Sequence, residues 1–389
     1  MNRARRVCIV RHRGYPTDVR VRKEARALID KGYEVDVICL KNENEKSRDT
    51  DYGVNIHRIP LQRHRGGLFR YFFEYISFFL VAMAKVSILH FRKRYDFIQV
   101  NTLPDFLVFV TVLPKLTGAK VLLDLHEPAP ELWGSLFGAH RKWMIAAIKF
   151  MEQMAIRYSD RAITVTEELK QTYVERGAPA SKISVILNVP NLEFRHEDFQ
   201  EYYHGNKERF SLICHGLITK RYGQEVAIKA IDRLKNEIPE IHLDILGYGP
   251  YQEELRILVS QLNLQDRVHI HGMIPFVDMI KMLAKSDIGI VPVLKNPYSD
   301  LVHTNKMFEL IAMRKPVVIT RTRAVEGFFG SDDSCLKYFE SGNERDLARC
   351  VLELYQDPRK REIMIRNSYE KFESVRWETM QEEYCKLFA

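Results

Sequence analysis

The residues best suited to chemistry lie in two loops of the second half of the chain, each directly before a helix. Lys220 and Arg221 follow the apolar run SLICHG and precede a predicted helix over 224–234. The free N–H groups and the positive dipole end of that helix would add to the two cations, and together they suit a diphosphate. A plain solvent-exposed basic loop is the alternative interpretation, because a single Lys-Arg pair is common.

The second loop, KNPYSDLVHTNK, leads from a predicted strand over 288–292 into a predicted helix. Backbone N–H groups around Thr304, Asn305 and Lys306 could bind another phosphate at the start of that helix. Glu309 lies one turn further on, where its carboxylate could accept hydrogen bonds from two ribose hydroxyls. The two loops together therefore indicate a nucleotide site.

Several common catalytic motifs are missing from the sequence. The first strand is followed by RHRGYP, which does not match the G-x-G-x-x-G fingerprint of dinucleotide-binding proteins. The sequence also contains no P-loop, no nucleophile elbow and no H-E-x-x-H zinc motif. His269 and His271 alternate on a predicted strand without further ligands and are interpreted as structural. Asp49 and Asp51 resemble a metal-binding carboxylate pair, but they lie in a polar run that we interpret as a solvated loop. We expect no metal site.

The elements that must position these loops follow an alternating rhythm. Strands are predicted over 6–10, 34–40, 54–59, 97–100, 120–123, 162–165 and 183–187, mostly separated by helices. The rhythm lapses over the polar stretch 191–209 and then resumes, with strands over 210–215, 241–246, 268–270, 288–291 and 316–319. This order predicts an α/β protein with two doubly wound, Rossmann-like parallel sheets. In such sheets ligands bind beyond the carboxyl ends of the strands, where both loops lie.

The same pattern predicts the domain boundaries. An N-terminal domain over 1–200 is the expected acceptor side, and a C-terminal domain over 201–370 is the expected donor side. A loop over 11–17 follows the first strand, and Thr17 or Asp18 is expected to cap the next helix, which Gly32 ends. One amphipathic helix is predicted over 368–388, and the C-terminal segment 371–389 is expected to pack against the N-terminal domain.

Segments along nearly the whole chain resemble one known family. They include YPTDVRVRKEARALIDKGYEVDVICL, LLDLHEPAPELW, VILNVPN, ICHGLITKRYGQEVAIKAI, LDILGYGPYQEEL, HGMIPFVDMIKMLAKSDIGIVPV and HTNKMFELIAMRKPVVIT. In this order and spacing the sequence resembles the retaining glycosyltransferases of the fourth sequence family, also described as glycosyl transferases group 1. The resemblance implies the GT-B fold, in which two Rossmann-like domains face each other across a cleft.

The resemblance also implies roles for the residues of the donor side. The family's donor-diphosphate cation corresponds to Arg221, with Lys220 beside it and Gly216 at the end of the preceding strand. A further family Arg is replaced by Leu217. Thr304, Asn305 and Lys306 match the phosphate-facing turn, and Glu309 matches the glutamate expected on the ribose. The first glutamate of the family's pair, eight positions before the one at Glu309 and expected near the donor sugar, is replaced by Leu301.

On the acceptor side the resemblance assigns fewer residues. His126 matches the histidine that contacts the transferred sugar, with a buried structural histidine as the alternative. Glu127 beside it is a further candidate for an acceptor or sugar contact. Gly14 and Tyr15 occupy the first turn of this domain, where the family brings backbone close to the donor phosphates.

The resemblance implies transfer of a sugar from a nucleoside-diphosphate sugar to an acceptor, with retention of configuration. Such a reaction builds negative charge on the leaving diphosphate, which Arg221, Lys220 and the 304–306 turn could stabilise without a metal or other cofactor. The acceptor is expected to be a glycan or a lipid-linked saccharide. The alternatives are a sugar-nucleotide epimerase of the same fold and a non-catalytic module that binds sugar nucleotides or glycans.

Composition limits the partners and the location. The 389 residues are 46% hydrophobic and carry 59 Lys and Arg against 51 Asp and Glu, which excludes a disordered chain. The net charge of +8 fits anionic partners, but no nucleic-acid motif accompanies it, so nucleic acid is not expected. Scattered cysteines and the lack of a secretory signal predict a cytoplasmic protein.

One apolar segment, Leu68 to Phe91, is long enough to cross a bilayer. Arg70, Glu74, Ser77 and Lys85 form a narrow polar stripe along it, which argues against a crossing. We expect a helix almost fully buried in the core. The alternative is a helix whose apolar face contacts the cytoplasmic membrane surface, flanked by Arg63, Arg65 and the cations of 92–94.

Overall fold

The structure is a computed structural model that describes residues 4–61, 68–137, 142–191, 198–199 and 209–389. It divides into two compact units. Unit 1 comprises Met1–Asn188 together with Glu378–Ala389, and unit 2 comprises Val189–Trp377. The chain therefore changes unit at 188/189 and at 377/378, where the sequence pattern placed the changes at 200 and 371. Most of the polar stretch 191–209 lies outside the described residues.

Unit 1 is built on an eight-stranded sheet in the order β3-β4-β2-β1-β5-β6-β7-β8. All neighbours pair in parallel except β3 and β4. The strands are β1 (Arg6–Gly14), β2 (Glu34–Leu40), β3 (Arg48–Asp51), β4 (Val54–Ile59), β5 (Phe97–Asn101), β6 (Lys120–Leu125), β7 (Arg161–Thr164) and β8 (Ile183–Val185). Since β1 lies between β2 and β5, the direction of winding reverses at its carboxyl end, which is where such folds bind ligands.

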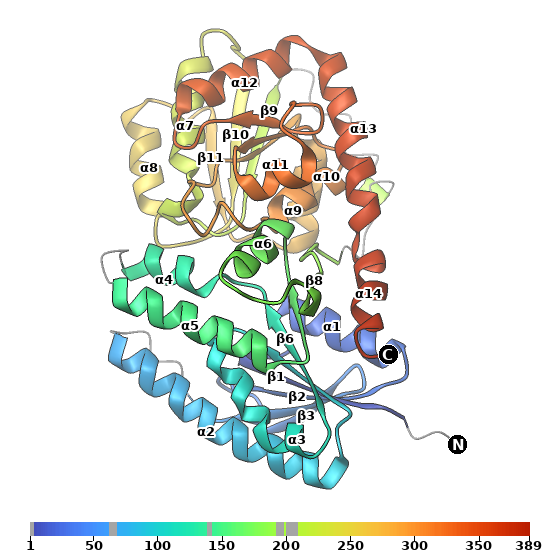
Figure 1. The fold of residues 1–389 in the computed structure, drawn as a ribbon. Coiled ribbons are helices and arrows are strands. Elements are labelled where there is room, and N and C mark those ends of the chain that lie inside the picture. The colour runs from blue at the N-terminus through green and yellow to red at the C-terminus, as the bar shows by residue number, and fades with distance from the viewer. Residues whose placement is uncertain (1–3, 62–67, 138–141, 192–197, 200–208) are drawn as a thin grey trace. The chain divides into compact units, whose positions relative to one another are not determined.

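Helices connect these strands and cover the sheet (Figure 1). They are α1 (Val19–Asp30), α2 (Leu68–Lys93), η1 (Asp105–Thr111), α3 (Val112–Leu116), α4 (Ala129–Phe137), α5 (Lys142–Tyr158), α6 (Glu167–Glu175), η2 (Ala180–Lys182) and, from the far end of the chain, α14 (Trp377–Lys386). The Asp18 side chain caps α1 by accepting from the Val21 N–H, and Gly32 follows the helix with a φ of +82°, as the sequence predicts.

Unit 2 contains a six-stranded parallel sheet in the order β11-β10-β9-β12-β13-β14. Its strands are β9 (Phe210–His215), β10 (Ile241–Leu246), β11 (Val268–Gly272), β12 (Ile288–Val291), β13 (Val317–Thr320) and β14 (Lys337–Phe339). Here the winding reverses between β9 and β12. Both loops singled out in the sequence leave the sheet at this point, so the topology brings them together.

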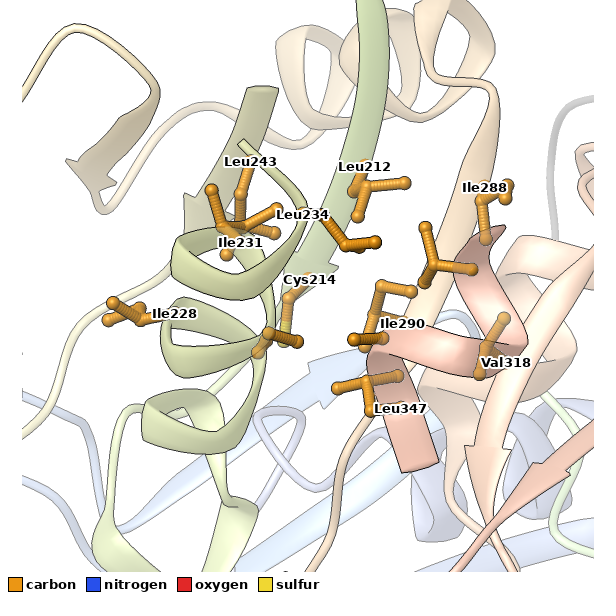
Figure 2. Close-up of a cluster of buried hydrophobic side chains, with 14 of the residues drawn as sticks. Leu212, Cys214, Ile228, Ile231, Leu234, Leu243, Ile288, Ile290, Val318 and Leu347 are labelled. Carbon is orange, nitrogen blue, oxygen red and sulfur yellow. The ribbon is translucent and has the colours of Figure 1, made fainter. Parts of the chain in front are cut away.

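The helices of unit 2 are η4 (Lys220–Tyr222), α7 (Gln224–Leu234), α8 (Gln252–Gln261), α9 (Phe276–Lys285), α10 (Asn305–Ala312), α11 (Arg323–Phe329), α12 (Glu344–Gln356) and α13 (Pro358–Val375). Figure 2 shows how α7 and α12 contribute to the core on one face of the sheet: Ile231 and Leu234 of α7 and Leu347 of α12 point toward the side of the central strands that carries Leu212 and Ile290. This dry core fixes the strand ends from which the site loops depart.

Two predicted elements are wrong in detail. The strand expected over 6–10 continues to Gly14, so most of the predicted 11–17 loop is strand. Asp49 and Asp51 are exposed or half-buried as expected, but they belong to β3, which pairs with β4 at the edge of the sheet. A short polar edge strand carries no apolar alternation, because neither face is buried, and a sequence pattern therefore misses it.

The single helix predicted over 368–388 is also wrong. It is two helices, α13 and α14, separated at Arg376, whose backbone is extended with a φ of −57° and a ψ of 163°. The amphipathic pattern continues through the break because each of the two helices buries one apolar face. The two faces are buried in different units. Phe372 of α13 packs against Phe308 of unit 2, whereas Phe388, just after α14, packs against Phe97 of unit 1.

The prediction for α2 is wrong about its burial. Only 28% of the apolar stretch within Phe73–Lys93 is buried inside the protein, although core burial was expected. By length and composition this helix could cross a membrane. Its polar residues point inward instead: Glu74 is buried and lies 3.3 Å from His12, and Lys85 donates to the Arg58 carbonyl. Arg63, Arg65 and the side chain of Arg70 lie outside the described residues.

Candidate nucleotide-diphosphate site

The candidate site of unit 2 starts at the carboxyl end of β9. Gly216 follows the strand with a φ of +104°, and a Cβ placed on it would lie 2.2 Å from Cε of Lys306. Gly247, after the neighbouring β10, has a φ of +132°, and its Cβ would lie 1.9 Å from the Gly216 carbonyl oxygen. Both dihedral angles favour glycine, and at Gly247 the backbone of Gly216 also leaves no room for a Cβ, so the loops after β9 and β10 are packed backbone to backbone there.

Arg221 and Tyr222 lie in η4, the short turn that precedes α7. Nη2 of Arg221 donates to the Tyr222 hydroxyl at 3.2 Å, and the Arg221 carbonyl accepts from the Leu294 N–H at 2.9 Å. The second bond ties η4 to the loop that leads to α10. Gly223 then begins α7 with a φ of +66°, and a Cβ there would lie 1.9 Å from the Pro292 carbonyl oxygen.

Lys306, in the first turn of α10, reaches the same place from the other loop. Its ammonium nitrogen lies 3.7 Å from the centre of the Tyr222 ring, and the Arg221 guanidinium lies 4.9 Å from that centre. Tyr222 therefore holds two cations close together, although their charges repel. Burial lowers the pKa of Lys306, and the nearby Arg221 charge lowers it further. An anion bound between the two cations would relieve this repulsion.

Two helix N-termini add to the positive potential. Among the described residues, no side chain caps α7 at Gly223 or α10 at Thr304. The first N–H groups of both helices are therefore left for a ligand or water. Thr304 and Lys306 are half-buried and Asn305 is exposed.

Glu309 lies one turn into α10, where it contacts the end of β9. Nε2 of His215 lies 2.6 Å from one carboxylate oxygen of Glu309. His215 is 3% exposed and the Glu309 side chain 19%, so the histidine holds the carboxylate from inside while the carboxylate keeps a solvent-facing part. A carboxylate fixed in this way retains an oxygen for external hydroxyl groups.

Unit 1 carries its own cluster of polar groups where β1, β5 and β6 end. Nη2 of Arg11 lies 2.9 Å from Nε2 of His126, and Nδ1 of His126 lies 3.8 Å from Asp124. Because a guanidinium can only donate, Nε2 accepts and the ring proton is on Nδ1. Burial, with Arg11 and Arg20 close by, holds the pKa of His126 well below its usual range, so the ring is neutral.

A buried network holds this cluster in place. Arg20 of α1 makes two hydrogen bonds to Asp124, of 2.9 and 2.8 Å, and lies 3.1 Å from Glu24. Gln99 donates to Glu24 and accepts a 2.5 Å hydrogen bond from the Tyr384 hydroxyl of α14. The last helix of the chain is therefore part of the support beneath His126.

The other candidates of unit 1 lie around the end of β1. Gly14 lines a hollow of about 400 Å³ together with residues 40–44, Pro60 and Leu61. Tyr15 as a whole residue is only 1% exposed, and its carbonyl accepts a hydrogen bond from Arg58 at 3.2 Å, so neither its side chain nor its carbonyl is open to a ligand here. Glu127 is 22% exposed and lies 3.8 Å from Arg13. In the described parts of the chain, no group of three or more His, Cys, Asp or Glu side chains could hold a metal ion.

Comparison with known families decides the relationship. Residues 17–189 match the family model described as "Glycosyl transferase 4-like domain", and residues 195–371 match the one described as "Glycosyl transferases group 1". Together these two matches account for nearly the whole chain. The chain belongs to the group 1 glycosyltransferases.

Among curated proteins, this group 1 glycosyltransferase is similar to the putative colanic acid biosynthesis glycosyltransferase WcaL of Escherichia coli K12. The two are 30% identical over 184 residues, which cover 47% of this chain and 44% of WcaL. Over 170 residues it is 26% identical to the WcaL of Salmonella typhimurium, covering 43% of this chain and 41% of that protein. The matched segment is thus less than half the length of either relative.

Solved structures agree in fold over the full chain. Sucrose-phosphate synthase from Thermosynechococcus elongatus has a TM-score of 0.78 at 18% identity, covering 99% of this chain and 98% of that one. Anabaena HepE in complex with UDP-glucose has a TM-score of 0.71 at 15% identity, covering 98% of each chain. The predicted fold class, two Rossmann-like domains of GT-B type, is confirmed.

The structure brings some of the predicted site residues together and separates others. Arg221 and Lys306 lie around Tyr222, Lys306 also lies against Gly216, and Glu309 contacts the end of β9 through His215. Lys220 is exposed at the start of η4. Leu217 is 39% exposed, whereas Leu301 is 2% exposed, so the residue at the position of the first of the family's two glutamates is buried. The roles of all these residues remain predictions.

Two residues of the site were not singled out in the sequence. His215 is a polar residue at the end of an otherwise apolar strand, a pattern that marks a side chain pointing at a strand-end site. Tyr222 follows Arg221 directly in the sequence, and nothing in the local pattern marks it as a site residue. Its role as the ring between two cations depends on contacts from α10, some 84 residues away, which no local pattern contains.

Proposed function

We propose that this protein transfers a sugar from a nucleoside-diphosphate sugar to an acceptor, and that unit 2 binds the donor through its diphosphate. The observation that supports this most directly is the convergence of Arg221 and Lys306 on Tyr222. Two cations held within 4.9 Å of one ring, beside two uncapped helix N-termini, form a site for a doubly charged anion.

The chemistry of the transfer follows from where charge develops. As the bond between sugar and diphosphate breaks, the sugar gains positive character and the diphosphate gains negative charge. Arg221, Lys306 and the first N–H groups of α7 and α10 are fixed where that diphosphate would lie, and fixed donors of this kind lower the barrier. Each charge-assisted hydrogen bond contributes about 1.5–3 kcal/mol. We propose that these groups replace a metal ion and that the enzyme needs no cofactor.

Glu309 is proposed to bind the ribose. The His215 contact leaves one of its oxygens toward solvent, one turn into the helix whose N-terminus would bind phosphate. The nucleotide base is left open, because the solved relative HepE is described with UDP-glucose and a curated mycobacterial relative is described as GDP-mannose-dependent.

Unit 1 is proposed to be the acceptor side. Both ring nitrogens of His126 face protein groups, so we propose that it contacts the transferred sugar through its backbone or ring edge and is positioned by Arg11 and Asp124. The hollow beside Gly14 would receive part of the acceptor, which we propose is a glycan or a lipid-linked saccharide. Retention of configuration is proposed on the family relationship.

A panel of UDP-, GDP- and ADP-sugars tests this function. The purified protein is mixed with each donor and a set of glycan and lipid-linked acceptors in EDTA, and release of the nucleoside diphosphate is measured. We expect release that depends on acceptor and survives EDTA, with product of the same anomeric configuration as the donor. Conversion of the donor without acceptor would indicate an epimerase, and binding without turnover across the panel would indicate a non-catalytic module.

A further inference from the structure

The long helix α2 buries its acidic side chain and exposes apolar ones, the reverse of an ordinary surface helix. Its carboxylate, Glu74, is 9% exposed and lies against His12 of β1, and Lys85 reaches back to the Arg58 carbonyl. These contacts fasten the polar side of α2 to unit 1. A membrane-spanning position is therefore excluded for this helix as it is packed here, because crossing would tear both polar groups from their partners.

Another side of α2, adjacent to the one that carries Glu74 and Lys85, is apolar and exposed. Phe73 is 72% exposed, Leu80 54%, Ile88 52% and Phe91 53%. These positions recur at the spacing of a helix and form one stripe along most of its length. Large apolar side chains that are this exposed along one continuous stripe mark an interaction surface.

A second helix, α5, likewise buries its acidic side chain and exposes apolar ones. Glu152 is 1% exposed and is bound by Arg176 at 3.1 Å, and Gln153 beside it is also buried. Trp143 is 76% exposed and Phe150 65%. Two helices of one unit thus bury their carboxylates and expose aromatic rings.

The stripes of α2 and α5 are linked into one surface by η1 and α3. Phe79 of α2 packs against Phe106 of η1 at 5.8 Å between ring centres, and Phe109 of η1 packs against Tyr158 of α5 at 5.0 Å. Leu116 of α3, which follows η1, is 78% exposed. In Figure 1 both helices lie on the left side of unit 1. We call these exposed apolar side chains of α2, α3 and α5 the apolar surface.

The exposed charges carried by the helices of the apolar surface are basic. In the described residues of α2, η1, α3 and α5 the acidic side chains are Glu74, Asp105 and Glu152, and all three are buried. The exposed charged residues of these elements are basic: Arg92, Lys142, Lys149 and Arg157. A hollow of about 400 Å³ at the end of α2 is lined by Arg5, Arg94 and Lys120 together with Asp96, so basic groups outnumber acidic ones there.

We propose that the apolar surface docks on an anionic lipid bilayer, with α2 and α5 lying in the interface and the basic residues contacting lipid headgroups. Aromatic and aliphatic side chains with flanking Lys and Arg are the composition that binds this interface. A second copy of the chain is a poorer occupant, because a symmetric contact would bring the same cations of two copies together. This inference concerns unit 1 and does not rest on the proposed function.

Vesicle co-sedimentation at low salt tests the proposal. We expect the protein to bind mixed phosphatidylglycerol–phosphatidylcholine vesicles and to bind pure phosphatidylcholine vesicles much more weakly. The double variant Leu80→Glu, Phe150→Glu should weaken binding to the mixed vesicles by at least roughly tenfold, because it places charge in the apolar layer. The matched control Ile257→Glu, Val277→Glu changes two exposed apolar residues of unit 2 and should bind like wild type.

Two further variants keep the test independent of folding. Lys142→Gln with Lys149→Gln changes only exposed cations and should weaken binding by roughly fivefold for each residue, with a smaller salt dependence. Trp143→Phe should still bind but lose most of the vesicle-induced blue shift of tryptophan fluorescence. The proposal is wrong if wild type does not prefer anionic vesicles, if the apolar double variant and its control bind alike, or if the surface instead mediates self-association without vesicle binding.

Discussion

At the residue scale, Glu309 offers the clearest separation of roles within the site. Its carboxylate is held by His215 and lies beside the two cations on Tyr222. If Glu309 binds ribose, it contributes to the affinity only for ligands that contain a ribose. A nucleoside diphosphate contains one and inorganic pyrophosphate does not, although both contain the two phosphate groups.

We therefore predict that Glu309→Ala weakens binding of UDP or GDP by about tenfold, which corresponds to about 1.4 kcal/mol, and changes pyrophosphate binding little. Isothermal titration calorimetry with both ligands measures this. Asp244→Ala is the matched control, since it removes a carboxylate that lies 2.6 Å from His271 elsewhere in unit 2. If the variant weakened the binding of both ligands equally, Glu309 would act on the phosphate groups or on the structure of the site, and not on the ribose.

His303, just before the α10 N-terminus, makes the stability of unit 2 depend on pH. Burial lowers the pKa of His303 to about 4 from an ordinary value of 6.5. Between pH 6.5 and about 4 the unfolded chain is protonated at His303, whereas the folded protein keeps the ring neutral. The stability that the neutral His303 contributes is therefore complete above pH 6.5 and is lost as the pH falls through this range. The loss is about 1.4 kcal/mol per pH unit within that window.

We predict that His303→Gln flattens the dependence of the free energy of unfolding on pH by about that slope between pH 6.5 and 4. Urea unfolding of unit 2, followed at several pH values, measures the difference from wild type. A variant with an unchanged slope would show that His303 titrates normally in the folded protein.

At the element scale, the loops of the site are held by glycines that have no alternative. Gly223 has a φ of +66° and its Cβ would lie 1.9 Å from the Pro292 carbonyl oxygen. Gly32, at the end of α1, has a similar φ of +82° with no atom of the described residues within 4 Å of its Cβ position. Replacing Gly32 thus adds only backbone strain, whereas replacing Gly223 adds both backbone strain and a steric clash.

We predict that Gly32→Ala costs about 1 kcal/mol of stability, the effect of the dihedral angle alone, and leaves ligand binding unchanged. Gly223→Ala should cost about 2 kcal/mol or more and also weaken nucleotide binding, because η4 and Arg221 must move away from Pro292. Thermal unfolding and calorimetry check both effects. Equal results for the two variants would contradict the packing described here.

The elements also show what the sequence could and could not predict. Strands with apolar runs, the cap of α1 and both site loops were predicted, because their signals are local: Asp18, Gly32 and the Lys220–Arg221 pair carry them. The orientation of α2 was not predictable, since an apolar helix with one polar stripe fits either orientation. His12 and Arg58, which hold that stripe inward, come from other parts of the sequence.

At the scale of the whole molecule, the chain returns to unit 1 after completing unit 2. The Tyr384 hydroxyl of α14 donates to the Gln99 side chain of β5, and both groups are buried. Unit 1 therefore depends on residues that follow the whole of unit 2 in the sequence. The sequence pattern predicted this docking but merged α14 with α13, because amphipathic periodicity does not say which core a helix faces.

We predict that Tyr384→Phe destabilises unit 1 by about 1–3 kcal/mol, the cost of leaving a buried amide oxygen without its donor. Hydrogen exchange should show faster exchange in β1 and β5 and little change in β9 and β12. Tyr355→Phe, which removes a hydroxyl bound to Glu240 in unit 2, is the control. A Tyr384 variant that loosens both units equally would show that they unfold together.

The central claim is that cations of unit 2 bind the donor diphosphate in place of a metal ion. Calorimetric titration of UDP and GDP in EDTA tests it most directly, using wild type, Arg221→Ala, Lys306→Ala and the exposed control Arg256→Ala. We predict that wild type and the control bind at least one nucleotide equally well with and without EDTA, and that each site variant binds it about tenfold or more weakly. Binding that requires added Mg²⁺, or site variants that bind like wild type, would contradict the account.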